Sequence, residues 1–300
     1  MDKPIEINKL AKAFRDKKRR KVEALFGLDL EIAQGEVFGF LGPNGAGKST
    51  TIKSLMGLIK PTSGSARLFG VPVDDYRARE RIGYLPENPS FYEYLTAREY
   101  LHMVGRLFRL TNREVKLKAA EILELLLLSA AADRPIRGYS KGMVQRLGLG
   151  QTLIHDPELF ILDEPMSGLD PIGRALVKDL MLELKSRGKT IFFSTHVIAD
   201  VEAVCDRVAI LVQGKLRAEN AVKELVSAGI TGYMVRLEQQ PPAALHNYLV
   251  NDPSKELGEL YVPRSQFNDF MINVNQLGCA VHLIEPQRQS LEDFFLKTIA

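Results

Sequence analysis

The apolar positions of this chain follow two periodicities that alternate along its first two thirds. Short apolar runs, typical of buried strands, occupy residues 36–41, 82–85, 158–162, 190–194 and 208–211. The predicted helices lie within residues 51–56, 96–132, 138–153 and 171–187. Strands that alternate with helices predict an α/β fold, in which a mostly parallel sheet carries helices on both faces.

The first residues predict further strands and a charged turn. Residues 5–7 are expected to form an edge strand, and residues 28–32 alternate strictly between apolar and polar, as in a half-exposed strand. Residues 66–69 predict another strand. The basic run from Arg15 to Lys21 is predicted at a hairpin tip, where it is either solvated or in contact with anionic lipid headgroups or nucleic acid.

Residues 88–152 are predicted to form a helical subdomain inserted into this α/β unit. Thr96 can cap a helix there, and Glu99 three residues later completes a capping box. We therefore expect a helix to begin at residue 97.

The pattern changes again after residue 218, and residues 219–300 are predicted to form a small α+β domain. Ferredoxin-like topology is one arrangement that suits it. The expected strands are residues 233–238, 259–262 and 280–285. The expected helices are residues 243–250 and 266–277, which lie between these strands, and residues 291–299 at the end. Ser290 and Asp293 resemble a capping box for the last helix, and Asn251–Pro253 is a predicted turn.

Composition limits the classes of partner. The 300 residues carry 40 basic and 37 acidic side chains, and a net charge of +3 is too small to imply a polyanionic partner. Cys205 and Cys279 fit no metal or disulfide pattern, which suits a reducing compartment. The charged first residues do not resemble a signal segment, and no segment is long and apolar enough to span a bilayer. We expect any membrane role to depend on another chain.

One glycine-rich stretch joins a predicted strand to a predicted helix, and it fits the pattern G-x-x-x-x-G-K-[ST]. Its residues are Gly42, Pro43, Asn44, Gly45, Ala46, Gly47, Lys48, Ser49 and Thr50. Glycines let backbone N–H groups approach phosphate oxygens, and the helix N-terminus adds partial positive charge. Lys48 can reach the β- and γ-phosphates and Ser49 can ligate Mg²⁺. The stretch predicts a nucleotide site.

A second strand ends in two carboxylates, Asp163 and Glu164. Open α/β sheets bind ligands at the carboxyl ends of their strands, so both side chains are expected near the phosphate loop. Asp163 is predicted to hold Mg²⁺, and Glu164 can polarise the attacking water.

Three more features accompany these motifs: Tyr139–Arg146 before the carboxylate strand, Ser167–Asp170 after it, and His196 at the end of the next predicted strand. Together with the phosphate loop, in this order and spacing, they resemble the ATP-binding subunit of ABC transporters over residues 5–215. The tail resembles the C-terminal extension of export-type members.

The resemblance implies roles for residues at matching positions. Lys48, Ser49 and Thr50 would hold ATP and Mg²⁺, and Asp163 and Glu164 would be the Mg²⁺ and general-base carboxylates. His196 would contact the γ-phosphate, and Phe14 occupies the position of an aromatic residue that stacks on adenine. Each of these two also fits a purely structural role.

The loop around Ser140 and Gly142 resembles the family's signature loop, which caps ATP bound by another subunit. The resemblance therefore implies a head-to-tail homodimer, or a pair of ATP-binding subunits, with two ATP molecules in the interface. Lys141 departs from the pattern by replacing a glycine. Glu87 also departs from it, standing where the family usually carries a Gln that meets Mg²⁺; a carboxylate can still ligate Mg²⁺.

The function implied is ATP hydrolysis that powers a separate multi-span permease, with export as the expected direction, at the cytoplasmic face of the cell membrane. Pro89–Leu95 would lie in the groove that receives the permease, or be buried within the helical insertion. The alternative is a soluble ABC-type ATPase that acts on ribosomes or nucleic acid; the chain has one cassette and no sustained heptads, so no nucleic acid is expected.

Overall fold

The computed structural model describes residues 3–15, 18–227, 230–250, 259–288 and 295. The chain divides into two compact units, Met1–Val222 and Lys223–Ala300. The predicted boundary at residue 218 falls inside a strand of the first unit, since residues 215–221 pair with residues 207–212.

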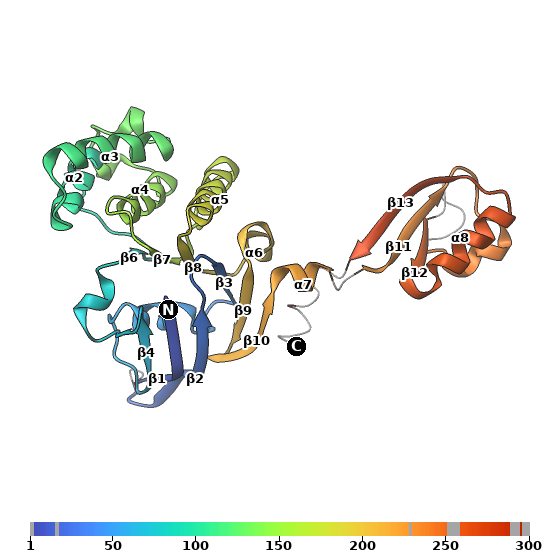
Figure 1. The fold of residues 1–300 in the computed structure, drawn as a ribbon, viewed down its shortest axis with the longest axis horizontal. Coiled ribbons are helices and arrows are strands. Elements are labelled where there is room, and N and C mark those ends of the chain that lie inside the picture. Colours follow the sequence, from blue (N-terminus) through green and yellow to red (C-terminus); the bar gives the residue numbers. More distant parts are fainter. Residues whose placement is uncertain (1–2, 16–17, 228–229, 251–258, 289–294, 296–300) are drawn as a thin grey trace. The chain divides into compact units, whose positions relative to one another are not determined.

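A six-stranded sheet forms the centre of the first unit, in the order β10-β9-β3-β8-β7-β6 (Figure 1). Its strands are β3 (Val37–Leu41), β6 (Ile82–Leu85), β7 (Leu159–Asp163), β8 (Thr190–Thr195), β9 (Arg207–Val212) and β10 (Lys215–Ala221). All neighbours are parallel except β9 and β10. Every residue of β3, β7 and β8 is buried, which explains their continuous apolar sequence. The predicted α/β sheet is confirmed.

A second, antiparallel sheet has the order β2-β1-β4-β5. Its strands are β1 (Ile5–Arg15), β2 (Lys21–Ile32), β4 (Ser63–Leu68) and β5 (Val71–Pro72). The prediction of an edge strand at residues 5–7 is wrong, because β1 lies between β2 and β4 and continues to Arg15. A register shift after Ile7, with Lys9 at φ 46°, interrupts the alternation that would have revealed the longer strand.

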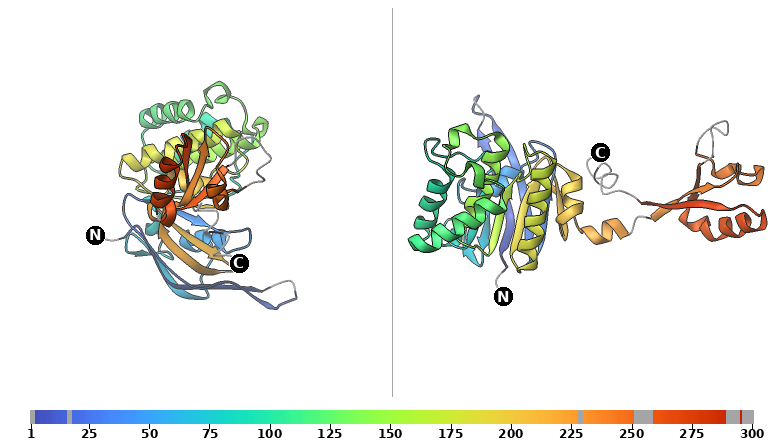
Figure 2. Two further views of the ribbon diagram at one scale, coloured as in Figure 1. Left: turned by 90° about the vertical axis from the view of Figure 1, so that its right-hand side faces the viewer. Right: turned by 90° about the horizontal axis from the view of Figure 1, so that it is seen from above.

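Helix α1 (Lys48–Leu55) contacts strands of both sheets, and one apolar core includes residues of both. The other helices of this unit lie on the opposite side of the parallel sheet (Figures 1 and 2). They are α2 (Ala97–Leu107), α3 (Asn112–Leu125), α4 (Lys141–Leu153), α5 (Pro171–Ser186) and α6 (Ile198–Val204). The unit also contains short 3₁₀ turns at Tyr76–Arg79, Ser129–Ala131 and Ile136–Gly138. The capping box of Thr96 and Glu99 is present at the start of α2.

The second unit begins within helix α7 (Val222–Ser227) and contains a three-stranded antiparallel sheet of order β12-β11-β13. Its elements are β11 (Ile230–Leu237), β12 (Glu259–Pro263), α8 (Phe267–Gln276) and β13 (Val281–Arg288), with 3₁₀ turns at Ala243–Tyr248 and Arg264–Gln266. The segment 243–250 is thus a 3₁₀ turn rather than an α-helix. Save for Phe295, the predicted helix 291–299 lies outside the described residues, as do the turn 251–253 and the cap at Ser290 and Asp293.

Among the described residues, none of the helices has both the length and the apolar character needed to cross a bilayer.

Candidate functional site

The phosphate loop runs from the end of β3 to the start of α1, and its shape depends on glycine. Gly45 and Gly47 have φ values of 79° and 110°, which L side chains rarely adopt. A Cβ on Gly42 would lie 2.3 Å from the carbonyl oxygen of Leu211, so no other residue fits there. The N–H of Gly214 donates to the carbonyl of Ala46 at 2.8 Å and holds the loop against the end of β9.

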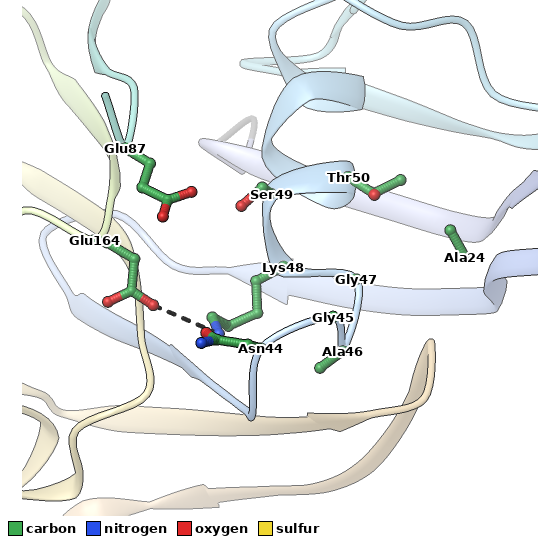
Figure 3. Close-up of a pocket in the computed structure, with 10 residues that line it drawn as sticks. All are labelled: Ala24, Asn44, Gly45, Ala46, Gly47, Lys48, Ser49, Thr50, Glu87 and Glu164. Atoms are coloured by element: carbon green, nitrogen blue, oxygen red, sulfur yellow. Dashed lines mark ion pairs between the residues drawn. The ribbon is translucent and has the colours of Figure 1, made fainter. Parts of the chain in front are cut away.

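This loop forms one wall of a cavity of about 290 Å³. The lining residues are Ala24, Asn44, Gly45, Ala46, Gly47, Lys48, Ser49, Thr50, Glu87 and Glu164 (Figure 3). The Lys48 ammonium is almost buried and donates to the carbonyl oxygens of Gly42, at 2.6 Å, and Pro43, at 3.3 Å. Residues 44–50 of the predicted loop therefore line one concave site, whereas Gly42 and Pro43 are not part of its described lining.

Strand β7 delivers Asp163 and Glu164 to the edge of this cavity. The hydroxyl of Ser49 lies 3.3 Å from Asp163 Oδ1 and donates to it. Ser194, at the same level of the neighbouring strand β8, donates to the same oxygen at 2.6 Å. Asp163 is 1% exposed, so these two hydroxyls supply polar partners that a buried carboxylate needs.

The Glu164 carboxylate lies between two other predicted site residues. Its Oε1 is 3.5 Å from the Lys48 ammonium, and its Oε2 is 3.0 Å from His196 Nδ1. His196 follows β8 and its side chain is half exposed, whereas Lys48 and Glu164 are nearly buried. An anionic group is thus held beside a cation and an imidazole at the mouth of the phosphate loop.

Strand β6 and the loop after it contribute two residues near the site: Tyr84 lies on the strand, and Glu87 lies in the loop. Figure 3 shows the Glu87 carboxylate pointing toward Ser49, across the cavity from Lys48. Burial, together with the negative charge of Asp163, raises the pKa of Tyr84 to about 12, so this phenol stays neutral.

The loop around Ser140 lies apart from this cavity. Ser140 caps helix α4 by accepting from the N–H of Met143, and neither Ser140 nor Gly142 is among the described residues that line the cavity. Lys141 is exposed, and its methylenes lie over Gly168, where a Cβ would be 2.7 Å from Lys141 Cε. The loop and the segment 167–170 are therefore in contact within one chain.

Phe14 is a further predicted site residue that is absent from the described lining of the cavity. Its side chain, on β1, is 42% exposed, and the Lys12 ammonium lies 5.0 Å from its ring centroid. Ala24, on the paired strand β2, lines the cavity instead.

Two buried polar residues at the site received no role from the sequence. Ser194 is fully buried in β8. Gln145 on α4 is 3% exposed and donates to the backbone carbonyls of Glu164 and Pro165. Polar residues in otherwise buried segments are the signal that could have identified both.

Comparison with known proteins identifies the family. The sequence model of the family described as ABC transporter matches residues 25–167. An uncharacterized ABC transporter ATP-binding protein of Nostoc sp. is 43% identical over 283 residues, which cover 93% of this chain and 84% of the relative. The Nod factor export ATP-binding protein I of Rhizobium meliloti is 34% identical over 297 residues, which cover 98% of this chain and 87% of the relative.

Solved structures agree with this assignment. An ATP-binding subunit of an ABC transporter is 30% identical, with a TM-score of 0.67 over 74% of this chain and 91% of that one. A second structure, an ATP-binding cassette solved as a dimer after hydrolysis with ADP and Pi, is 23% identical and has a TM-score of 0.68. It covers 73% of this chain and 98% of that one, and at this identity it supports the fold alone.

Proposed function

This chain belongs to the ABC transporter family as an ATP-hydrolysing subunit, and we propose from this premise that two copies close around two ATP molecules to drive a separate membrane permease. The observation that carries the proposal is the position of the Glu164 carboxylate, 3.5 Å from Lys48 Nζ and 3.0 Å from His196 Nδ1 beside the phosphate loop. A carboxylate in this position can act as a general base at the γ-phosphate.

The loop supplies the groups that position the phosphates. Backbone N–H groups of Gly45–Thr50 and the N-terminus of α1 favour bound anions, and Lys48 adds a full charge. A Cβ on Gly47 would lie 2.8 Å from the carbonyl of Ala24, so the close approach of this backbone requires glycine. These features fit a triphosphate.

Hydrolysis then needs a water molecule aligned with the γ-phosphorus. The water oxygen forms a bond to phosphorus while the bond to the β–γ bridging oxygen breaks, and Glu164 accepts the proton that the water releases. His196 orients Glu164 through its Nδ1 and contacts the γ-phosphate, and Lys48 stabilises the charge that develops on the phosphate oxygens.

The oxygen donors at the loop suit Mg²⁺, which would neutralise phosphate charge when bound. Ser49 Oγ and Asp163 Oδ1 lie 3.3 Å apart beside the cavity, and Glu87 adds a carboxylate on the opposite wall. The described residues contain no cluster of three or more His, Cys, Asp or Glu side chains that could hold a metal alone. This fits Mg²⁺, which takes few protein ligands and completes its shell with phosphates and water.

The second half of each site is proposed to come from another copy of the chain. Ser140 and Gly142 stand at the start of α4 but do not line the chain's own cavity. Their backbone N–H groups and the helix N-terminus suit the γ-phosphate of ATP held by the other subunit, in a head-to-tail homodimer or a pair of related subunits. Phe14, exposed on β1, is proposed to stack on the adenine.

We propose a multi-span permease as the membrane partner, which would hold this chain at the cytoplasmic face of the cell membrane. The exposed Tyr92 and Tyr94 are candidate contacts, because aromatic side chains are enriched at protein interfaces. Export is the proposed direction, since relatives that match 80% or more of this chain are named for Nod factor export.

The experiment compares the wild type with Glu164→Gln, which keeps the shape of the side chain but removes its basicity. We expect ATP turnover to fall by roughly 10²–10⁴-fold, with ATP binding retained and a stable ATP-bound dimer seen by size-exclusion chromatography. The matched control is Glu183→Gln, an exposed carboxylate on α5, which should leave turnover unchanged.

The same trapped variant, tagged and solubilised from membranes with ATP, identifies the partner. A stoichiometric multi-span membrane protein supports the transport proposal. Recovery of ribosomes or nucleic acid in its place would overturn the transport proposal, and wild-type turnover in Glu164→Gln would overturn the general-base assignment.

A further inference from the structure

The proposed general base lies on a strained piece of backbone. Glu164 has φ 50°, a left-handed conformation that is unfavourable for a residue with a side chain. Such a conformation persists only where the surroundings determine it strongly. The direction of the Glu164 side chain therefore depends on the groups that hold its peptide units.

Ser194 holds the amino side of this turn. The N–H of Glu164 donates to Ser194 Oγ at 3.0 Å, and the same hydroxyl donates to Asp163 Oδ1 at 2.6 Å. Ser194 is fully buried, so one hydroxyl fixes both carboxylate residues from the neighbouring strand without competition from water.

Gln145 holds the carboxyl side. Its Nε2 donates to the carbonyl of Glu164 at 3.2 Å and to the carbonyl of Pro165 at 3.3 Å. The side chain is 3% exposed and comes from α4, whereas Ser194 comes from β8. The two carbonyls are thus held by an amide that lies 19 residues before Glu164 and 20 residues before Pro165 in the chain.

We propose that Gln145 is a positioning residue for ATP hydrolysis. By holding the carbonyls of the Glu164–Pro165 and Pro165–Met166 peptide units, while Ser194 holds the N–H of Glu164, it keeps the Glu164 carboxylate directed at Lys48 and His196. This inference rests on the proposed role of Glu164 as general base. Gln145 is not among the described residues that line the cavity, and its hydrogen bonds reach the backbone carbonyl of Glu164 rather than its carboxylate, so it acts through the backbone.

The test replaces Gln145 with Met, which has a similar length and no N–H donor. We expect kcat to fall on the order of tenfold to hundredfold, as for a catalytic group displaced by about 1 Å, while the KM for ATP and ATP-dependent dimerisation stay within about twofold of wild type. Gln151→Met is the control on the same helix; Gln151 accepts a hydrogen bond from the Tyr100 hydroxyl, and its substitution should leave kcat unchanged. A Gln145→Met protein with wild-type kcat would overturn the proposal, as would one that loses dimerisation together with turnover.

A second variant tests the same role if Gln145→Met does not fold. Gln145→Glu has the shape of the natural side chain, but its ionised form cannot donate a hydrogen bond, whereas its protonated form can donate one. Its activity relative to wild type should therefore rise as the pH is lowered toward the carboxyl pKa. A ratio that does not change with pH contradicts the positioning role.

A double-mutant cycle separates this inference from the proposed function. If Gln145 acts through Glu164, adding Gln145→Met to Glu164→Gln should lower turnover by less than about twofold further. An undiminished effect of Gln145→Met in that background refutes the inference. If Glu164→Gln alone retains wild-type turnover, the general-base assignment fails, whereas a fully active Gln145→Met beside an inactive Glu164→Gln refutes only the role of Gln145.

Discussion

The phosphate loop and the turn at Glu164 meet at one cavity, yet they obtain their shapes in different ways. The loop has glycines, Gly45 and Gly47, at the positions with positive φ, so its conformation is determined by residues of the loop itself. The turn places a glutamate at φ 50° and depends on Ser194 and Gln145, which come from other elements of the fold. One half of the site is therefore encoded locally, and the other half exists only when three distant segments have packed together.

The largest effect in the loop is expected for Gly47→Ala. Its Cβ would lie 2.8 Å from the carbonyl of Ala24 at a φ of 110°, so the loop must move away from its present path. Backbone strain of about 1–3 kcal/mol corresponds to roughly a tenfold to hundredfold loss of ATP affinity, measurable with a fluorescent nucleotide.

Gly188→Ala is the control for this substitution. Gly188 also has a positive φ, at 76°, but a Cβ there meets no atom within 4 Å and the residue lies outside the cavity. It should lower thermal stability slightly and leave ATP affinity as in the wild type. Equal losses of affinity in both variants would show that the loop is not set by its own glycines.

A smaller effect is expected in the turn for Ser194→Ala. The substitution leaves the buried N–H of Glu164 without its acceptor, which costs about 1–3 kcal/mol of folding free energy. We expect a fall of about tenfold in kcat at nearly constant KM for ATP, because the carboxylate is misdirected while the phosphate loop is intact.

Thermal denaturation and steady-state kinetics measure these two consequences separately. Ser186→Ala, whose exposed hydroxyl donates to the carbonyl of Glu183, is the matched control and should change neither kcat nor KM. If Ser194→Ala raised KM and left kcat unchanged, the contrast between the loop and the turn would be wrong.

The same contrast explains how far the sequence could predict this site. The phosphate loop, the carboxylates at the end of β7 and the cap at Thr96 depend on neighbours within a few residues, so the sequence predicts where each lies along the fold. Gln145 was visible within a motif, but its partners are the backbone carbonyls of residues 164 and 165, and no local pattern reports such a contact.

The antiparallel sheet shows the same limitation at the level of the fold. Residues 5–7 predicted a short edge strand, but β1 is held on both sides along most of its length by β2 and β4. Register shifts remove the strict alternation on which a sequence-based prediction depends. Likewise, the position of Phe14 outside the cavity depends on strand pairing, in which it faces Val22.

The smallest predicted effect concerns His155, which joins the helical insertion to the sheet by contacts that no local pattern reveals. Its ring is stacked on Phe108 at 3.7 Å, and its Nε2 lies 3.0 Å from the carbonyl of Ile82 on β6. Burial lowers the pKa of His155 below its ordinary value of 6.5, and the nearby Lys118 and Lys189 act in the same direction. The neutral ring is therefore the form that the folded protein prefers.

The sign of the pH effect follows from that preference. The unfolded chain binds a proton at His155 more readily than the folded chain, so the stabilising contribution is complete above pH 6.5 and is lost as the pH falls toward the lowered folded value. His155→Gln can keep a donor for the carbonyl of Ile82 but does not titrate. Between about pH 7.5 and pH 5.5 its melting temperature should fall less than that of the wild type, by a few degrees. The control is His102→Gln on α2, whose melting temperature should change with pH as that of the wild type does. If the melting temperatures of His155→Gln and the wild type fell equally between these pH values, the protonation of His155 would not affect stability and this prediction would be wrong.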